Sequence, residues 1–145
     1  MFSQAPGRPQ THRVPAMPTP EEVRAAVDAY VDAYRQDSRE ALLATFASDA
    51  VWHDPVGAPP HEGHERIGAF WDQVHTMAER IVLEPKDVVV CGNEAAMVFT
   101  INAHVGDGGM VFDAVETFVV DDDAKITLLK AYWDMGRARP MSDSA

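Results

Sequence analysis

The N-terminal half of the chain carries apolar residues at intervals of three and four, the spacing of a helix with one buried face. Residues 19–34 begin with Thr-Pro-Glu-Glu, which can cap a helix and close a capping box. Residues 37–46 repeat the signal with Asp37 as the cap, and residues 67–78 carry a third apolar stripe. We therefore expect three N-terminal helices.

From residue 80 onward the apolar period changes to two, which is typical of strands. The alternating runs cover residues 80–84, 87–91, 95–105, 109–120 and 125–135. Short turns rich in Gly, Asn and Asp separate the later runs. Helices followed by hairpin-connected strands indicate the α+β class, and we expect a strongly curved antiparallel sheet that wraps the three helices on one face.

Length and composition fit one domain. The 145 residues are 46% hydrophobic, which is enough for a single core or one apolar pocket. Residues 1–18 hold four prolines and no apolar run, so we expect a flexible tail there rather than a signal peptide. We assign the folded domain to residues 19–137 and a second tail to residues 138–145.

Charge and cysteine content narrow the range of partners. The formal net charge of -11, without a cluster of Lys or Arg, disfavours binding to nucleic acid or anionic lipid. No run approaches the roughly 20 apolar residues that a membrane helix needs. The single cysteine, Cys91, cannot form a disulfide within the chain, which fits a reducing cytoplasm. We expect a cytoplasmic protein whose partner is neither nucleic acid nor a membrane.

A single carboxyl interrupts an apolar row in the strand predicted at residues 109–120. One face of that strand reads Met110, Phe112, Ala114, Glu116, Phe118 and Val120. The neighbouring faces are unbroken and read Ala95, Met97, Phe99, Ile101 and Ala103 in one strand, and Leu129, Ala131 and Trp133 in the last. If these faces meet, Glu116 lies in low dielectric and stays protonated. The alternatives are a solvent-exposed face, or an ion pair between Glu116 and a Lys or Arg.

Two other residues are candidates for the same site. Asp54 either caps a turn before Pro55 or directs a carboxylate at a ligand. Tyr30 lies on the apolar face of the first helix, either as a core aromatic or with its hydroxyl in a pocket. A tyrosine, an ionisable aspartate and a protonated glutamate together make an acid/base set.

The motifs around these residues resemble those of the ketosteroid isomerases (steroid delta-isomerases) within the nuclear-transport-factor-2-like, or SnoaL-like, superfamily. The resemblance covers about residues 20–136 and rests on EEVRAAVDAYVDAY, LLATFASDAVWHDPVGAPPHEG, IGAFW and KITLLKAYW. The DPVG turn followed by IGAFW is the most specific part. The fold that the resemblance implies is a conical barrel formed by the curved sheet.

The resemblance also assigns roles. The family's general base falls on Asp54, its oxyanion-binding tyrosine on Tyr30, and its second oxyanion donor, a protonated aspartate, on Glu116. The side chains expected to bind substrate are Trp71, Met97, Phe99, Ile101, Phe118, Leu129 and Trp133. The chain departs from the family at Glu116 itself, which replaces aspartate. It also departs at Phe46 and Trp71, which replace supporting tyrosines and leave the Trp71 indole NH as a partial substitute.

The implied activity is an intramolecular isomerisation of the 3-oxo-Δ5-steroid Δ-isomerase type. Asp54 moves a proton so that a β,γ double bond of a 3-ketosteroid, or of a similar hydrophobic enone, shifts to the α,β position through a dienolate. The reaction needs no cofactor and no metal, and we interpret His61 and His64 as solvated turn residues rather than metal ligands. The implied partners are a hydrophobic small molecule, here a steroid, and a second copy of the chain in a homodimer.

Three alternatives stay open. Epoxide hydrolases of this fold are recognised by an arginine that bridges two aspartates. The predicted strand that holds Asp113 and Glu116 contains no arginine, which argues against this activity. A SnoaL-like polyketide cyclase would share acid/base chemistry at Asp54 without needing Tyr30 and Glu116 on one oxygen. A noncatalytic small-molecule-binding protein is the third, because a fold does not fix a function.

Overall fold

The computed structural model describes residues 17–141 and contains the three predicted helices. They are α1 (Pro20–Arg35), α2 (Arg39–Thr45) and α3 (Gly63–Met77). The predicted capping box is confirmed, since Glu22 N donates to Thr19 Oγ1 at 3.1 Å and Thr19 N donates to Glu22 Oε1 at 2.9 Å. Asp37 is not the cap of α2, because the cap is Ser38, whose hydroxyl accepts a hydrogen bond from Ala41 N.

The described strands form one open sheet of mixed direction. They are β1 (Phe46–His53), β2 (His61–Glu62), β3 (Arg80–Cys91), β4 (Glu94–Val105), β5 (Gly108–Val120), β6 (Ile126–Tyr132) and β7 (Arg139–Pro140). The order is β2-β1-β6-β5-β4-β3, with β7 on β5. The runs predicted at 80–84 and 87–91 belong to one strand, β3, whose pairing is irregular between Pro85 and Asp87.

The sheet departs from the predicted antiparallel arrangement at one junction. β1 pairs with β6 in parallel, while the other pairings are antiparallel. β1 and β6 are far apart in the sequence, so no hairpin constrains their relative direction. The α+β architecture with three N-terminal helices against a curved sheet is confirmed, and the sheet is open rather than closed into a barrel.

The predicted tails fall mostly beyond the described part of the chain. Residues 1–16 lie outside it, so the tail predicted at 1–18 is described only at Met17 and Pro18. Of the tail predicted at 138–145, Arg139 and Pro140 form β7 and pair with β5. The domain therefore extends past residue 137.

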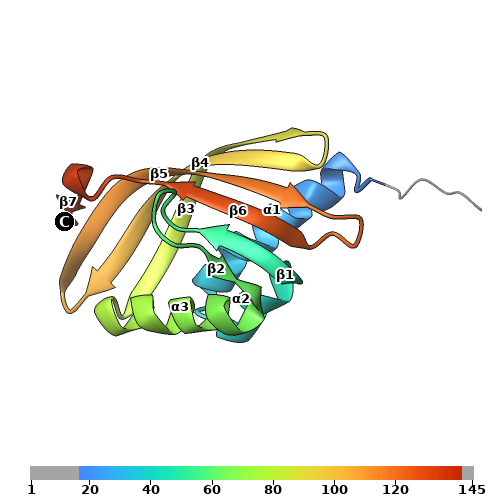
Figure 1. The fold of residues 1–145 in the computed structure, drawn as a ribbon. Helices are drawn as coiled ribbons and strands as arrows, with labels where there is room; N and C mark the ends of the chain where they lie inside the picture. Colours follow the sequence, from blue (N-terminus) through green and yellow to red (C-terminus); the bar gives the residue numbers. More distant parts are fainter. Residues whose placement is uncertain (1–16, 142–145) are drawn as a thin grey trace, which may run out of the picture.

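The helices and the sheet form two layers. Figure 1 shows the sheet bending over α1, with α3 along the opposite side of the molecule from β4 and β5. α1 packs on β3, β4 and β5, and α3 packs on β1. The concave face of the sheet is thus turned toward α1 and α3. No helix among residues 17–141 is long and apolar enough to cross a membrane.

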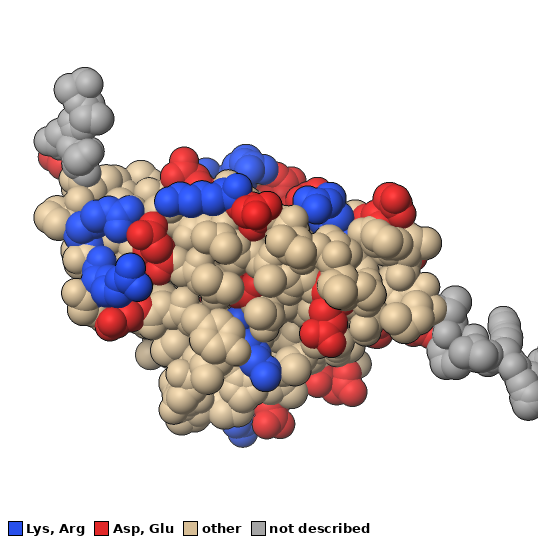
Figure 2. All heavy atoms as spheres, turned by 90° about the horizontal axis from the view of Figure 1, so that it is seen from above, with Lys and Arg blue, Asp and Glu red and all other residues tan. Residues whose placement is uncertain are grey.

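The strand residues alternate between the buried and the outer face of the sheet as predicted. On β5 the buried row is Phe112, Ala114, Glu116, Phe118 and Val120, and Glu116 is only 3% exposed. The opposite, outer face carries three exposed valines, Val89, Val98 and Val115. Viewed from above, the molecule shows acidic and basic side chains interspersed with uncharged ones (Figure 2).

Candidate active site

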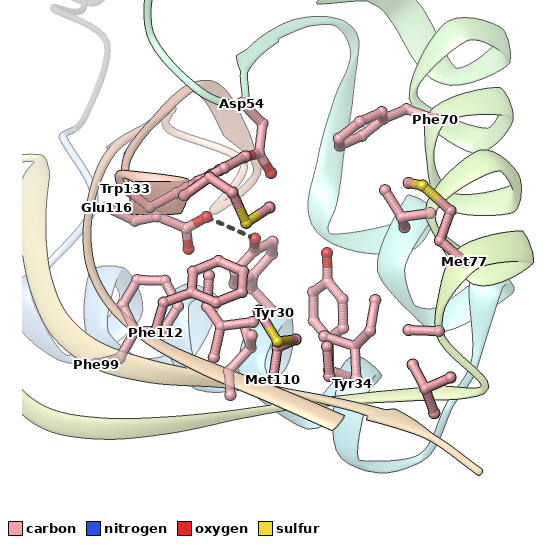
Figure 3. Close-up of a pocket in the computed structure, with 18 residues that line it drawn as sticks. Tyr30, Tyr34, Asp54, Phe70, Met77, Phe99, Met110, Phe112, Glu116 and Trp133 are labelled. Carbon is pink, nitrogen blue, oxygen red and sulfur yellow. Dashed lines mark hydrogen bonds between the residues drawn. The ribbon is translucent and has the colours of Figure 1, made fainter. Parts of the chain in front are cut away.

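An apolar cavity of about 310 Å³ lies between α1, α3 and the concave face of the sheet (Figure 3). Ligand sites in proteins commonly measure roughly 300 to 1,000 Å³. The apolar wall includes Phe70, Val74, Ile81, Leu83, Phe99, Ile101, Ala103 and Phe112. The lining residues that carry polar groups are Tyr30, Tyr34, Asp54, Glu116 and Trp133. This composition suits an apolar molecule with few polar groups.

The three residues predicted to carry acid/base chemistry converge on this cavity. Tyr30 comes from α1, Glu116 from β5, and Asp54 directly follows β1. The Tyr30 hydroxyl donates a 3.0 Å hydrogen bond to Glu116 Oε2, and Tyr30 is only 1% exposed. In Figure 3, Asp54 points into the cavity from the wall above this pair.

Burial decides the protonation of Glu116. Desolvation raises its pKa well above the ordinary value, the charge of Asp54 raises it further, and the hydrogen bond from Tyr30 opposes the shift. Among the described residues no Lys or Arg lines the cavity, so the ion-pair alternative for Glu116 does not apply here. A protonated Glu116 can donate a hydrogen bond as well as accept one.

The second carboxyl oxygen of Glu116 is free. Oε1 has no hydrogen-bond partner among the described residues, although the side chain is buried. Leaving a buried polar atom unpaired costs about 1–3 kcal/mol. Because Glu116 lines the cavity, a ligand oxygen placed beside Oε1 would remove this cost.

Asp54 is held by an indole. Trp133, the residue after β6, donates a 2.6 Å hydrogen bond from Nε1 to Asp54 Oδ1. Desolvation raises the pKa of Asp54 to about 6, against the lowering effect of this hydrogen bond. At neutral pH Asp54 is therefore mostly ionised, whereas burial favours the protonated form of Glu116. One cavity thus holds two carboxyl groups whose environments favour different protonation states.

The residues predicted to bind substrate divide into two groups. Phe99, Ile101 and Trp133 line the cavity. The other four are buried in the core and are absent from the cavity wall: Trp71, Met97, Phe118 and Leu129. For the strand residues, alternation identified the buried face but not the positions of that face that border the cavity.

Sequence reasoning missed several lining residues, of which Tyr34 carries the most chemistry. It lies one helical turn after Tyr30, is 5% exposed, and its ring centroid is 5.5 Å from that of Tyr30. Its spacing within α1 was the available signal, since residues four apart share a helix face. The other aromatic lining residues that were missed are Phe70 and Phe112.

Other expected neighbours of Tyr30 lie near it but differ in detail. Phe46 contacts Tyr30 edge-on at 6.3 Å, so this neighbour offers no hydroxyl. The ring of Trp71 packs on Tyr34 at 4.9 Å. The aromatic contacts of Tyr30 are made with Tyr34, Phe46, Trp52 and Phe118.

The entrance of the cavity is apolar and exposed. Its lining includes Met77, Val105, Met110 and Met135, which are 65%, 50%, 39% and 58% exposed. The side chains with polar groups that line the cavity are more buried than this rim, because Tyr30, Tyr34 and Glu116 are each at most 5% exposed. A ligand would therefore bury its polar end and leave its apolar end at the entrance.

The two histidines predicted in a turn lie elsewhere, His61 on β2 and His64 in the first turn of α3, and each is partly buried. The ring of His61 stacks on Phe70 with centroids 4.0 Å apart. His64 Nε2 instead forms a 2.9 Å hydrogen bond with the carbonyl oxygen of Phe46. Each histidine therefore has a contact that accounts for its position in the structure.

The fold and this cavity define a small α+β domain with acid/base groups at the inner end of an apolar pocket. A model of the SnoaL-like domain matches residues 27–129. The chain belongs to the SnoaL-like domain family, which confirms the superfamily suggested by the sequence. A steroid Delta-isomerase from Nocardioides simplex is 32% identical over 115 residues, which cover 79% of this chain and 92% of the relative.

Solved structures show the same fold. The protein RV0760c from Mycobacterium tuberculosis has a TM-score of 0.76 at 24% identity, covering 84% of this chain and 98% of its own. The epoxide hydrolase/cyclase-like enzyme SalBIII, which acts in pyran ring formation in the polyether salinomycin, also reaches 0.76, at 20% identity with the same coverage. At these identities the likeness concerns the fold alone.

Proposed function

We propose that this chain is an intramolecular isomerase of the 3-oxo-Δ5-steroid Δ-isomerase type. It would shift a β,γ double bond of a 3-ketosteroid, or of a similar hydrophobic enone, to the α,β position. The observation that carries the proposal is the Tyr30–Glu116 pair at the buried end of an apolar cavity that Asp54 also lines. The similarity to the Nocardioides simplex steroid Delta-isomerase supports it.

Asp54 would act as the base. Its carboxylate removes a proton from the carbon between the carbonyl and the double bond, and the electron pair of that C–H bond passes into a dienolate. Asp54 then returns the proton to the γ carbon, where a new C–H bond forms. The hydrogen bond from Trp133 fixes the carboxylate while it serves both positions.

Tyr30 and Glu116 would stabilise the dienolate oxygen. Both are neutral donors at physiological pH, because burial raises the pKa of the Tyr30 hydroxyl and of the Glu116 carboxyl. With substrate bound, each would direct a proton at the same oxygen, which occupies the position beside the free Oε1 of Glu116. Donors already placed where negative charge develops lower the barrier most effectively.

A polyketide cyclase is the second candidate, favoured by the family match and by the shared fold of SalBIII. It could use Asp54 for proton abstraction in the same cavity, but the reaction gives no specific reason for two donors on one oxygen. The epoxide hydrolase alternative is less favoured. Asp113 has a guanidinium partner, Arg139, but that pair is exposed and lies off the cavity wall.

We further infer a cytoplasmic homodimer that pairs through the outer sheet face. Three exposed valines, Val89, Val98 and Val115, form its apolar part, and Val98 pairs directly with Val115 across β4 and β5. On the face seen in Figure 2, side chains of both charges stand among uncharged ones, so two copies related by a two-fold axis can match opposite charges. Cys91 is an exposed lone thiol, which is compatible with a reducing compartment.

The test is isomerisation of a β,γ-unsaturated 3-ketosteroid, followed by the absorbance of the conjugated product. Asp54→Asn should lower the rate roughly 100- to 10,000-fold, because the amide cannot accept the substrate proton. Binding of a steroidal phenol that mimics the dienolate should be retained, since the cavity is unchanged. Asp49→Asn on the exposed face of β1 is the matched control and should keep full activity. If Asp54→Asn turned over substrate as fast as the wild type, Asp54 would not be the base.

A further inference from the structure

The Tyr34 hydroxyl is a cavity group to which the proposed reaction gives no role. Tyr34 and Tyr30 both project from α1 into the cavity, and Figure 3 shows their hydroxyls pointing toward the same region. Trp133 Nε1 is already bonded to Asp54, and Tyr30 and Glu116 are bonded to each other. Among the described lining residues, the Tyr34 hydroxyl and Oε1 of Glu116 are thus the polar side-chain groups left without a partner in these hydrogen bonds, and the proposed reaction already uses Glu116.

The ring of Tyr34 is fixed from the side of α3. It packs on Trp71 with centroids 4.9 Å apart, and Trp71 stacks on His75 at 4.1 Å. His75 Nδ1 lies 2.7 Å from the carbonyl oxygen of Trp71 and so ties the stack to the helix backbone. A side chain held in this way presents its hydroxyl at a constant position, which is what a precise supporting group requires.

The neighbours of Tyr30 show why such support matters. Phe46, Trp52 and Phe118 surround its ring without a hydroxyl group, and Tyr34 is the aromatic contact that has one. When Tyr30 turns its proton toward a substrate oxygen, its own oxygen keeps two lone pairs in a buried site. An unpaired phenolic oxygen there is unfavourable, and a donor to it also makes Tyr30 a stronger donor.

We propose that Tyr34 is a positioning residue, whose hydroxyl donates to the phenolic oxygen of Tyr30 when Tyr30 binds the substrate oxygen. This inference rests on the proposed function for its catalytic consequence, but the donor arrangement itself can be tested with any phenol that binds the site. Burial raises the pKa of Tyr34 well above its ordinary value, so the hydroxyl remains a neutral donor at physiological pH.

The variant that isolates this role is Tyr34→Phe, which removes the hydroxyl and keeps the ring against Trp71. We expect kcat to fall roughly 2- to 15-fold with little change in KM, the size of one neutral hydrogen bond. Tyr132→Phe is the control, because Tyr132 is exposed at the end of β6 and does not line the cavity. If Tyr34 only fills space, Tyr34→Phe will match the wild type in kcat.

A second measurement does not depend on turnover. The measurement uses the Asp54→Asn variant, in which residue 54 carries no negative charge that would oppose ionisation of a bound phenol. The absorbance of substituted 2-naphthols bound to this variant gives the fraction of the naphthol that is ionised. Adding Tyr34→Phe should lower the ionised fraction several-fold at a given naphthol pKa, while adding Tyr132→Phe should not. An unchanged ionised fraction, or failure of the site to ionise any bound naphthol, would overturn the inference. If the wild type does not isomerise ketosteroids but Tyr34→Phe still lowers ionisation, the proposed function fails and the role of Tyr34 stands.

Discussion

The indole of Trp133 and the carboxylate of Asp54 form a 2.6 Å hydrogen bond that joins the end of β6 to the turn after β1. These two strands are the parallel pair of the sheet, so their ends reach the cavity side by side. The bond fixes the carboxylate and lowers its pKa against the effect of burial. The position of Asp54, the base of the proposed reaction, thus depends on the β1–β6 pair, where the strands run in parallel.

Trp133→Phe should shift the pH dependence of the reaction. Without the indole NH, desolvation acts unopposed and the pKa of Asp54 rises above about 6. Because the base must be ionised, the inflection of kcat/KM should move to higher pH, and activity near that inflection should fall. The ring can still pack on Phe112, which limits damage to the fold. A pH–rate profile with the wild-type inflection would show that the bond does not tune the base.

The stability of the folded protein should also depend on the titration of Asp54. The folded pKa of Asp54, about 6, lies above the ordinary 3.8, so between these values the folded protein binds more protons than the unfolded chain. Stability due to this group is therefore present at low pH and is lost as pH rises through that window.

Asp54→Asn removes the titrating carboxyl and, with it, the loss of stability as the pH rises. The difference in melting temperature between Asp54→Asn and the wild type should be more positive at pH 8 than at pH 4. Asp49→Asn, at an exposed position of β1, is the control substitution. Equal differences for Asp54→Asn at both pH values would contradict the raised pKa.

Three substitutions at Glu116 separate its possible roles. Glu116→Gln keeps a neutral donor and should cost little, whereas Glu116→Ala removes the donor and should lower kcat roughly 10- to 1,000-fold. Glu116→Asp tests reach, since it should raise activity if the extra methylene misplaces the donor and lower it if the cavity has adjusted to glutamate. Glu94→Gln, exposed on β4, is the control. Loss of activity in Glu116→Gln as complete as in Asp54→Asn would show that Glu116 acts as an ionised base.

Core and cavity positions on the same sheet face should respond differently. Leu129 is fully buried and absent from the cavity wall, so Leu129→Ala should cost about 2–5 kcal/mol of unfolding free energy and leave KM nearly unchanged. Ile101 lines the wall, so Ile101→Ala should raise KM about 10-fold through lost apolar contact. Denaturant unfolding and steady-state kinetics distinguish the two. A large rise in KM for Leu129→Ala would place that residue in contact with substrate.

Local signals predicted the helices and the strand faces. The capping box at Thr19 and the buried row around Glu116 follow from spacing along a short segment, and both are observed. Alternation could not separate Met97 and Leu129, which lie off the cavity wall, from Phe99, which lines it, because all three are fully buried and the other walls of the cavity come from distant parts of the sequence. The face of a strand is a local property, and the boundary of a cavity is not.

The contacts that complete the site are tertiary. The bond between Trp133 and Asp54 joins residues far apart in the chain through a parallel strand pair that no hairpin signal marks. Tyr34 was within reach of sequence reasoning, since it shares a helix face with Tyr30, but its spacing also fits an ordinary core residue. The stack with Trp71 and the exposure of its hydroxyl to the cavity become visible only when α1 and α3 are placed together.

The methionine-lined entrance has a consequence for the choice of substrate. Met77, Met110 and Met135 have flexible, polarisable side chains that can repack around differently shaped apolar surfaces. The inner end, by contrast, consists of buried groups held by aromatic packing and hydrogen bonds. Such a pocket discriminates strongly between functional groups and weakly between carbon skeletons. We therefore expect a catalyst that is strict about the position of the ketone and its double bond and tolerant of ring number and side-chain length.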